Sequence, residues 1–226
     1  MKFTVIRYTH DRLPTALDNY CRGVLSAALP DDVDLVYVGV DRPPTDPRAR
    51  WIPKALDSRG AYHDCYSRVL KGLEAAQCNK VFLVEHDNLY TREHFSEAPE
   101  PEEAVYHYQT NLWVANEFGY FSTRGRTVTA AVSAFKSDLL FHFDRSFKWV
   151  SDGLRIVWDE PGRSWVDDGI AFVASGEMVK WNASTPCLDI RYGGNLTGTR
   201  KGNKYIQTLP PFENHSALWT AINGGK

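Results

Sequence analysis

The segment Lys80–Tyr90, KVFLVEHDNLY, constrains the fold of this chain more than any other. Four consecutive apolar residues, Val81–Val84, run directly into Glu85, His86 and Asp87. A short apolar run bounded by polar residues is typical of a strand that is buried on both faces, as in a parallel sheet. In open α/β sheets, ligands bind at the carboxyl ends of the strands. The two carboxylates after this run are therefore predicted to lie at a ligand-binding edge.

Glu85 and Asp87 are separated by one residue. Two carboxylates held this close repel each other, and a divalent cation between them relieves that repulsion. Mg²⁺ and Mn²⁺ prefer oxygen ligands, so the pair fits a site for either ion. A solvated acidic turn is the alternative explanation of the same triplet. We expect His86 to be a packed or solvated side chain and not a metal ligand.

The first ninety residues alternate between predicted strands and helices. Apolar runs predict strands over Phe3–Tyr8 and Val33–Val40. Apolar residues at three- and four-residue spacing predict helices over Leu13–Ala28 and Tyr62–Ala76. The Pro-rich stretch Arg42–Pro53 is predicted to be a loop. This alternation of strands and helices is typical of a parallel α/β sheet with helices on both faces.

The second half of the sequence is less regular. Two strands and two helices are predicted there: Ala104–Val114, Thr127–Phe135, Leu139–Leu154 and Asp167–Ser175. Gly176 would end the last helix as a left-handed cap. From Asp189 onward the sequence is rich in Gly, Asn and Thr, and no internal repeat is present. We therefore expect a single domain over residues 1–226, with an irregular carboxyl-terminal lobe.

Composition narrows the class of protein. A formal net charge of −2 excludes a strongly basic nucleic-acid-binding coat, although it is compatible with a local basic groove. No apolar run approaches the roughly 18 residues that a membrane span needs, and the apolar stretch near Met1 is too short for a secretory signal. The four cysteines lack CxxC spacing and are expected to be reduced. We therefore expect a cytoplasmic protein with no membrane partner.

A parallel half that ends in an acid-x-acid element, followed by a mixed half, resembles the GT-A fold of nucleotide-sugar glycosyltransferases, especially the inverting, family-2-like enzymes. Glu85-His86-Asp87 stands at the place of that family's DxD element, with Glu first. Asp167-Asp168 followed by Gly176 looks like the family's later acid pair. The strings EHDNLYTREHF, TNLW and DIRYGGNLTGTR resemble a branch of glycosyltransferase-like proteins from bacteria and phages, so a phage-encoded chain would act in the host cytoplasm.

The resemblance implies a metal-dependent, inverting transfer of sugar from a nucleotide-sugar donor, with a UDP-sugar the first candidate, to an acceptor hydroxyl. It places Glu85 and Asp87 on Mn²⁺ or Mg²⁺ with the donor diphosphate. A carboxyl-terminal histidine often completes such a site, and His215 is the candidate here. Asp168 would be the general base, with Asp167 beside it. Residues 1–90 would bind the nucleotide, and residues 91–226 would supply the acceptor half and the carboxyl-terminal tail.

The family also places nucleoside contacts at the ends of the first two strands, here Thr9 and Asp41. A simple turn residue is the alternative for Asp41. Residues 191–204, RYGGNLTGTRKGNK, carry four cations and no acid. Glycine-rich, cation-bearing loops suit phosphate, because backbone N–H groups approach closely while Arg and Lys supply charge. Donor-diphosphate contacts are therefore predicted for Arg191, Arg200 and Lys201, and a mobile surface loop is the alternative.

Two other classes compete with this interpretation. A nucleotidyltransferase on a similar sheet also needs acids around Mg²⁺, but it normally has a Gly-rich phosphate loop after its first strand. Arg7–Pro14 contains no glycine, which disfavours that class. A non-catalytic nucleotide- or sugar-binding module is the other alternative.

The acceptor is open. Hydroxymethylated pyrimidines in double-stranded phage DNA are one candidate. Arg124 and Arg126, together with the basic run 191–204, would bind the phosphate backbone, and Trp113 and Trp165 would stack on a flipped base.

Overall fold

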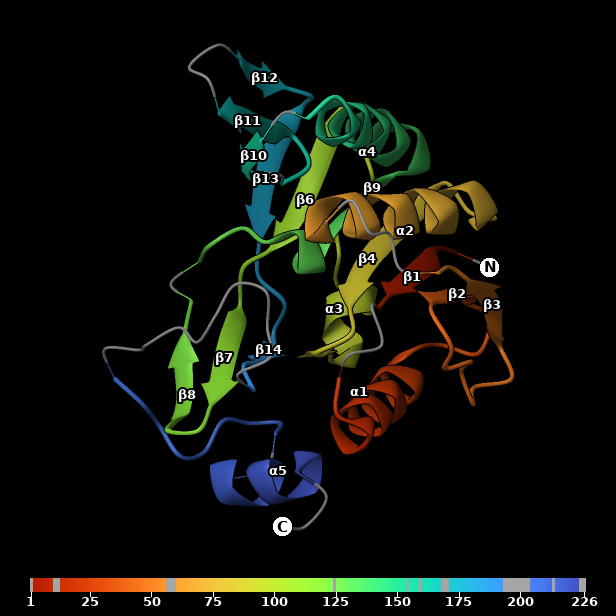
Figure 1. Cartoon of the computed structure of the whole chain (residues 1–226). Helices are drawn as coiled ribbons and strands as arrows, with labels where there is room; N and C mark the ends of the chain where they lie inside the picture. The colour runs from red at the N-terminus through yellow and green to blue at the C-terminus, as the bar shows by residue number, and fades with distance from the viewer. Residues whose placement is uncertain are drawn as a thin grey trace.

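Strand β1 (Thr4–Tyr8) is an inner strand of a mostly parallel sheet in the computed structural model (Figure 1). It pairs in parallel with β2 (Asp34–Gly39) on one side and with β4 (Lys80–Glu85) on the other. Every residue of β1 and β2 is buried, as is typical of central parallel strands. The structure describes residues 2–9, 13–55, 60–123, 125–153, 155–158, 160–167, 171–192, 204–212 and 214–223.

Within these ranges the central sheet has seven strands in the order β13-β6-β9-β4-β1-β2-β3. Neighbouring strands are parallel except around β9, which runs antiparallel to both β4 and β6. The strands not yet introduced are β3 (Ala49–Pro53), β6 (Val105–Gln109), β9 (Val132–Phe135) and β13 (Glu177–Trp181). This mixed α/β arrangement, with a parallel amino-terminal half, confirms the predicted fold class.

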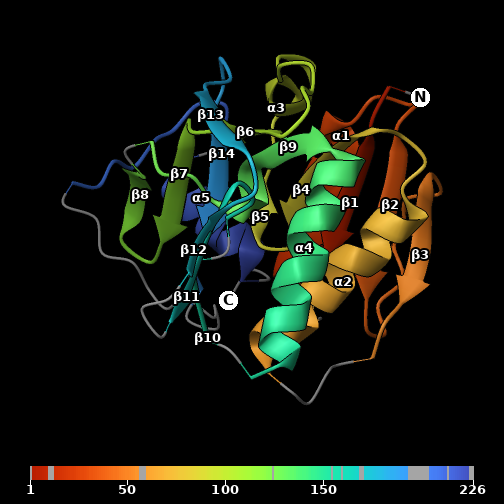
Figure 2. The ribbon, with the colours of Figure 1, turned by 90° about the horizontal axis from the view of Figure 1, so that it is seen from above.

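Helices cover both faces of this sheet, as the apolar periodicity predicts. α2 (Ala61–Ala75) and α4 (Lys136–Ser151) lie side by side on one face, and α1 (Thr15–Ala28) lies on the other (Figure 2). Leu73 of α2 and Ile6 of β1 belong to the same fully buried core. A short helix, α3 (Arg92–Ser96), follows β4. No helix in the described part of the chain is long and apolar enough to cross a membrane.

One predicted loop contains a strand. Arg42–Pro53 includes β3, which pairs in parallel with β2 at the edge of the sheet. The residues of β3 are only partly buried, so the strand lacks the continuous apolar run that marks β1 and β4. Pro53 is its last residue, and proline is tolerated at edge strands because one side needs no ladder hydrogen bond. The proline content that predicted a loop is therefore compatible with an edge strand.

The segment Ala104–Val114, predicted as one strand, forms parts of two strands in different sheets. β6 ends at Gln109, and β7 (Leu112–Asn116) belongs to a four-stranded sheet of order β5-β14-β7-β8. The other members are β5 (Asn88–Leu89), β14 (Cys187–Ile190) and β8 (Gly119–Ser122). α5 (His215–Ile222) packs against α1 and shares an apolar core with this sheet. The half that was expected to be irregular therefore contains a second sheet.

The helix predicted over Asp167–Ser175 is wrong. The structure has β11 (Arg163–Asp167) and β12 (Ala171–Ala174) there, paired antiparallel beside β10 (Arg155–Trp158). The sequence between Trp165 and Val173 carries an Asp-Gly dipeptide between β-branched and aromatic residues, which is a hairpin signal. The antiparallel pairing of β11 with β12, on either side of this dipeptide, replaces the expected helix. Thr127–Phe135, also predicted as a strand, is shortened to β9 after a 3₁₀ turn at Thr129–Ala131.

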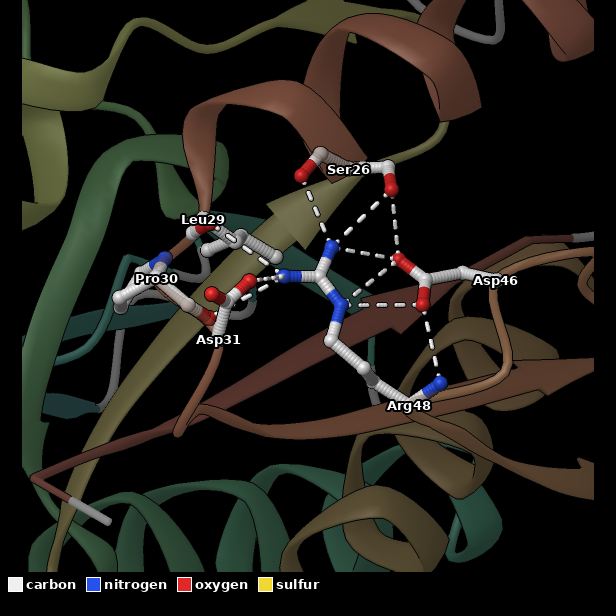
Figure 3. A network of polar contacts seen from close by, with 6 residues as sticks. All are labelled: Ser26, Leu29, Pro30, Asp31, Asp46 and Arg48. Carbon is white, nitrogen blue, oxygen red and sulfur yellow. Dashed lines mark hydrogen bonds and ion pairs between the residues drawn. The ribbon is translucent and has the colours of Figure 1, made fainter.

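Arg48 ties the segment before β3 to the carboxyl end of α1 (Figure 3). Its guanidinium donates to the carbonyl of Ser26 at 2.8 Å, to that of Pro30 at 3.1 Å and to the Asp46 carboxylate at 2.7 Å. The last carbonyls of a helix lack intrahelical partners, and a cation there is favoured by the helix dipole. Hydrogen bonds from Arg48 hold the pKa of Asp46 down at about 2. This network fixes the position of the edge strand.

We expect Arg48→Met to lower the free energy of unfolding by about 1–3 kcal/mol, because several part-buried acceptors lose their donor. Urea unfolding at pH 7 measures this change. Lys71→Met is the control, since Lys71 makes an exposed pair with Glu74 and such pairs contribute little. Equal effects from the two variants would show that the Arg48 network does not hold this edge together.

Candidate functional site

The order of the strands locates a candidate site before any side chain is considered. From β1 the chain moves outward through β2 to β3, and it then returns to β4 on the opposite side of β1. Ligands of open α/β sheets bind where the strand order reverses in this way, outside the carboxyl ends of the two strands. Tyr8 and Glu85 are the last residues of β1 and β4, and they are register partners. The acidic triplet therefore follows one of the two strands at this switch point.

Glu85 is held by two tyrosines. The Tyr8 hydroxyl donates to Glu85 Oε1 at 3.0 Å, and the Glu85 backbone N–H donates to the Tyr90 hydroxyl at 2.9 Å. The Tyr90 hydroxyl in turn donates to the Ala130 carbonyl at 2.7 Å. Burial and the nearby Glu85 charge raise the pKa of Tyr8 well above its usual value, so its hydroxyl keeps the proton that it donates. These contacts fix the end of β4.

A third acid, Asp189, joins Glu85 and Asp87. It lies on β14, opposite Asn88 of β5, and the N–H of the next residue, Ile190, donates to the Asp87 carbonyl at 3.0 Å. Burial raises the pKa of Glu85 to about 8, and the negative charges of Asp87 and Asp189 add to that shift. Without a bound cation, Glu85 is therefore largely protonated at pH 7.

Arg191 is the counter-charge within this cluster. Its Nε donates to Asp189 Oδ2 at 2.9 Å, and its Nη2 donates to the same oxygen. Burial opposes the charge on Arg191, but Asp189, Asp87 and Glu85 outweigh that cost and raise its pKa. The sequence groups Arg191 with a basic loop that would be exposed. In the structure its side chain is instead buried against the acids. Arg200 and Lys201 lie outside the described residues.

The charges of the cluster bear on metal binding. If all are ionised, three carboxylates face one guanidinium, an excess of two negative charges that a divalent ion would balance. Within the described residues, no group of three or more His, Cys, Asp or Glu side chains is arranged to hold a metal ion. Mg²⁺ is commonly bound by one or two carboxylates together with substrate phosphates. Glu85 and Asp87 fit that mode, with the remaining ligands supplied by a bound diphosphate.

His215 lies in a different environment. It is the first residue of α5, its ring stacks on Trp219 and meets the edge of Tyr120, and its Nε2 donates to the Asn116 carbonyl. The Nε2 proton is therefore used in holding α5 against β7. The structure does not assemble His215 with Glu85 and Asp87 into a metal-binding group.

The remaining predicted site residues are placed as follows. Thr9 is buried just beyond β1, and its N–H donates to the Val38 carbonyl at 2.9 Å. Asp41 is exposed just beyond β2. Both therefore lie at the carboxyl edge of adjacent parallel strands. Asp167 is the last residue of β11, and Asp168 lies outside the described residues. The helix that gave this acid pair its expected setting is absent from positions 163–167 and 171–174.

No protein-family model matches this sequence, and no curated protein does. Structural similarity extends to transferases of two kinds. Cytidylyltransferase for 2-C-methyl-D-erythritol 4-phosphate from Thermus thermophilus aligns over 100% of this chain and 99% of its own, with 12% identity and a TM-score of 0.48. S. aureus TarS, solved with UDP-GlcNAc, aligns over 92% of this chain and 62% of its own, with 11% identity and a TM-score of 0.49. The galactosyltransferase LgtC, solved with donor and acceptor sugar analogs, aligns over 79% of this chain and 73% of its own, with 15% identity and a TM-score of 0.47. With these TM-scores below 0.5, the function has to be argued from the site.

We expect the contribution of Glu85 to the stability of the metal-free protein to fall as pH rises from about 5 to 8. The folded-state pKa of Glu85, about 8, lies above its unfolded value. The stability that protonation of Glu85 contributes is therefore complete below the unfolded pKa and is lost as pH rises through about 8. Urea unfolding at several pH values measures this dependence.

Glu85→Gln cannot ionise, so its stability should decline less over that interval, by on the order of 1 kcal/mol per pH unit. Glu117→Gln, at an exposed position, is the control and should follow the wild type. Parallel profiles for Glu85→Gln and the wild type would contradict a raised pKa of Glu85 in the folded protein.

Proposed function

We propose that this protein is a metal-dependent, inverting glycosyltransferase that uses a nucleotide-sugar donor, with a UDP-sugar the first candidate. The observation that carries the proposal is the buried acid cluster at the switch point of the central sheet, where Glu85 and Asp87 follow β4. A nucleotide-sugar has a diphosphate leaving group whose negative charge must be neutralised. A cluster with excess negative charge, able to share a divalent cation with that diphosphate, suits this donor class.

Each residue near the cluster then has a task. Glu85 and Asp87 would hold Mn²⁺ or Mg²⁺, and the bound ion would act as a Lewis acid on the diphosphate oxygens. Tyr8 orients the Glu85 carboxylate by donating to it. Arg191 brings a guanidinium to the same place, where it can face phosphate oxygens, and Asp189 holds it there.

The other contacts of the donor are proposed from position. Thr9 and Asp41, at the ends of β1 and β2, lie along the edge where the nucleoside would extend from the diphosphate. Arg200 and Lys201 remain candidate diphosphate ligands from the glycine-rich run. His215 would have to give up its contact with the Asn116 carbonyl to reach a metal ion. We therefore propose that its main role is structural, to hold α5 against β7.

The screen that tests this function measures unfolding temperature with nucleotide-sugars, with and without Mn²⁺. Ligand binding stabilises the folded state by RT ln(1 + [L]/Kd), so the correct donor raises the unfolding temperature most when Mn²⁺ is present. Asp87→Asn should lose the Mn²⁺-dependent part of that rise while staying folded. Asp144→Asn, on the exposed face of α4, is the control and should keep it.

Different outcomes separate the competing classes. A Mn²⁺-dependent rise of wild-type size in Asp87→Asn would show that the metal site is elsewhere. Stabilisation by a nucleoside triphosphate, followed by pyrophosphate release when a sugar phosphate is added, would identify a nucleotidyltransferase. Donor binding with neither hydrolysis nor transfer to any acceptor would identify a binding module.

The acceptor is proposed from weaker observations. A hydroxymethylated pyrimidine in duplex DNA needs a basic surface for the phosphate backbone. Arg191 is buried against Asp189 and is not available for such a surface. Exposed cations among the described residues include Arg126, and Lys204 at the end of the glycine-rich run. Trp113, partly buried on β7, remains a candidate stacking surface for a flipped base or a sugar ring.

We expect the identified donor to transfer sugar to one of three acceptors offered in parallel: hydroxymethylated duplex DNA, unmodified duplex DNA and simple saccharides. Transfer to a saccharide and none to modified DNA would exclude the DNA proposal.

With the accepted substrate, Asp168→Asn should lower turnover by roughly 10²–10⁴-fold with donor binding retained, because a general base is removed. Asp167→Asn is made in parallel, and normal turnover in Asp168→Asn with loss in Asp167→Asn would reverse the assignment.

A further inference from the structure

Arg7 lies in β1, an inner strand of the sheet, and it is 1% exposed. It precedes Tyr8, so its side chain lies on the opposite face of β1, toward α1. Its Nη2 donates to Asp18 Oδ1 of α1 at 2.7 Å and to the His86 carbonyl at 3.0 Å. One nitrogen of a buried guanidinium thus joins α1 to the peptide between Glu85 and Asp87.

The acidic turn is held from both faces of the sheet. On one face, the Tyr8 hydroxyl binds the side chain of Glu85, while Tyr90, from the core on the opposite face, accepts a hydrogen bond from the Glu85 backbone N–H. On the other, Arg7 binds the His86 carbonyl, and the His86 Nδ1 lies 3.3 Å from the Tyr8 carbonyl. The orientation of the His86 peptide determines where the carboxylates before and after it point. Arg7 is therefore a charged contact at the residue that separates the two carboxylates.

Arg7 keeps its charge because Asp18 compensates it. Asp18 is also paired with Arg22 at 2.9 Å and lies 4.0 Å from Arg42. Arg7 and Arg22 both lie over the ring of Tyr37, at 5.2 and 5.6 Å from its centroid. Asp18 therefore retains a partner when Arg7 is replaced. This matters for a test, because a buried carboxylate left without any partner would destabilise the whole protein.

The same network reaches the edge where the nucleoside is proposed to lie. Arg22 Nη1 donates to the Pro43 carbonyl at 2.8 Å, and its Nη2 donates to the Arg42 carbonyl at 2.9 Å. Both residues follow β2 and Asp41 in the chain. Through Asp18, Arg7 thus connects the segment after β2 with the acidic turn after β4.

We propose that Arg7 is a positioning residue that sets the orientation of Glu85 and Asp87 and couples it, through Asp18 and Arg22, to the segment after β2. Its consequence for metal and donor binding rests on the proposed function. Residues that orient metal ligands from behind typically change metal affinity or activity by roughly 10–100-fold when replaced. Arg7 acts from behind the acids, so it is not itself a catalytic residue.

A structural ion pair with no effect on the site is the competing explanation, and the sheet offers a matched control. Arg50 of β3 donates to Asp34 Oδ1 at 2.6 Å and to the Ala75 carbonyl at 2.8 Å. This arginine also joins a carboxylate to a backbone carbonyl, but Asp34 begins β2 and so lies at the amino-terminal edge of the sheet. Arg50→Met removes the same kind of contact at the edge away from the acids.

The experiment compares wild type, Arg7→Met, Arg7→Lys and Arg50→Met in two measurements. Hydrogen exchange reports the amides of residues 85–89, and calorimetry reports UDP affinity in EDTA and in Mn²⁺. In Arg7→Met we expect these amides to exchange about tenfold faster, relative to the core strands, when the His86 carbonyl loses its charged donor. The Mn²⁺-dependent gain in UDP affinity should fall by roughly 10–100-fold. Affinity in EDTA should stay close to that of the wild type.

Arg7→Lys keeps a cation beside Asp18 and should recover part of both effects, whereas Arg50→Met should change neither. The proposal is overturned if Arg7→Met merely lowers the unfolding temperature, as Arg50→Met does, with local exchange and the Mn²⁺ effect unchanged. If the wild type binds no UDP under either condition, the donor assignment fails. The exchange comparison then still decides the positioning role, since it needs no ligand.

Discussion

Repulsion among buried carboxylates is the constraint on which the site of this protein depends. Burial and the charges of Asp87 and Asp189 raise the pKa of Glu85 to about 8, so without a bound cation the cluster relieves part of its repulsion by holding a proton. An isolated buried charge is costly, and such groups persist where they are paired, hydrogen-bonded or bound to a cation. Arg191 supplies part of the compensation and Tyr8 supplies a donor. The negative charge that these two groups leave uncompensated favours a cationic or proton-donating ligand.

The cluster also makes the two halves of the chain depend on each other. Glu85 ends a strand of the central sheet, whereas Asp189 belongs to β14 of the smaller sheet. The two sheets meet because β5, directly after the acidic turn, pairs with β14. Strand β9, also from the second half, extends the central sheet beyond β4. A ligand bound at the acids would thus contact residues from both halves of the chain.

The parallel half of the fold could be predicted because its signals are local. Buried strands such as Val81–Val84 and the apolar stripes of α1 and α2 need only the nearby sequence. Three features could not be read in this way. β3 lacks an apolar run because it lies at an edge, β6 and β7 are one apolar segment divided between two sheets, and Asp189 reaches the acids only through long-range strand pairing. The missed hairpin at β11 and β12 did have a local signal, its Asp-Gly dipeptide.

Neutral groups also support the acidic turn, from the face of the sheet on which Arg7 lies. The ring of His94 on α3 packs 5.1 Å from Tyr90, whose hydroxyl accepts the Glu85 N–H. Burial lowers the pKa of His94 to about 3, so this imidazole adds no positive charge near the acids at neutral pH. Because it stays neutral, His94 packs against Tyr90 and Phe82 without the cost of a buried charge. Cations that do reach the acidic turn and its cluster in the described residues, such as Arg7 and Arg191, each have a fixed carboxylate partner, Asp18 for Arg7 and Asp189 for Arg191.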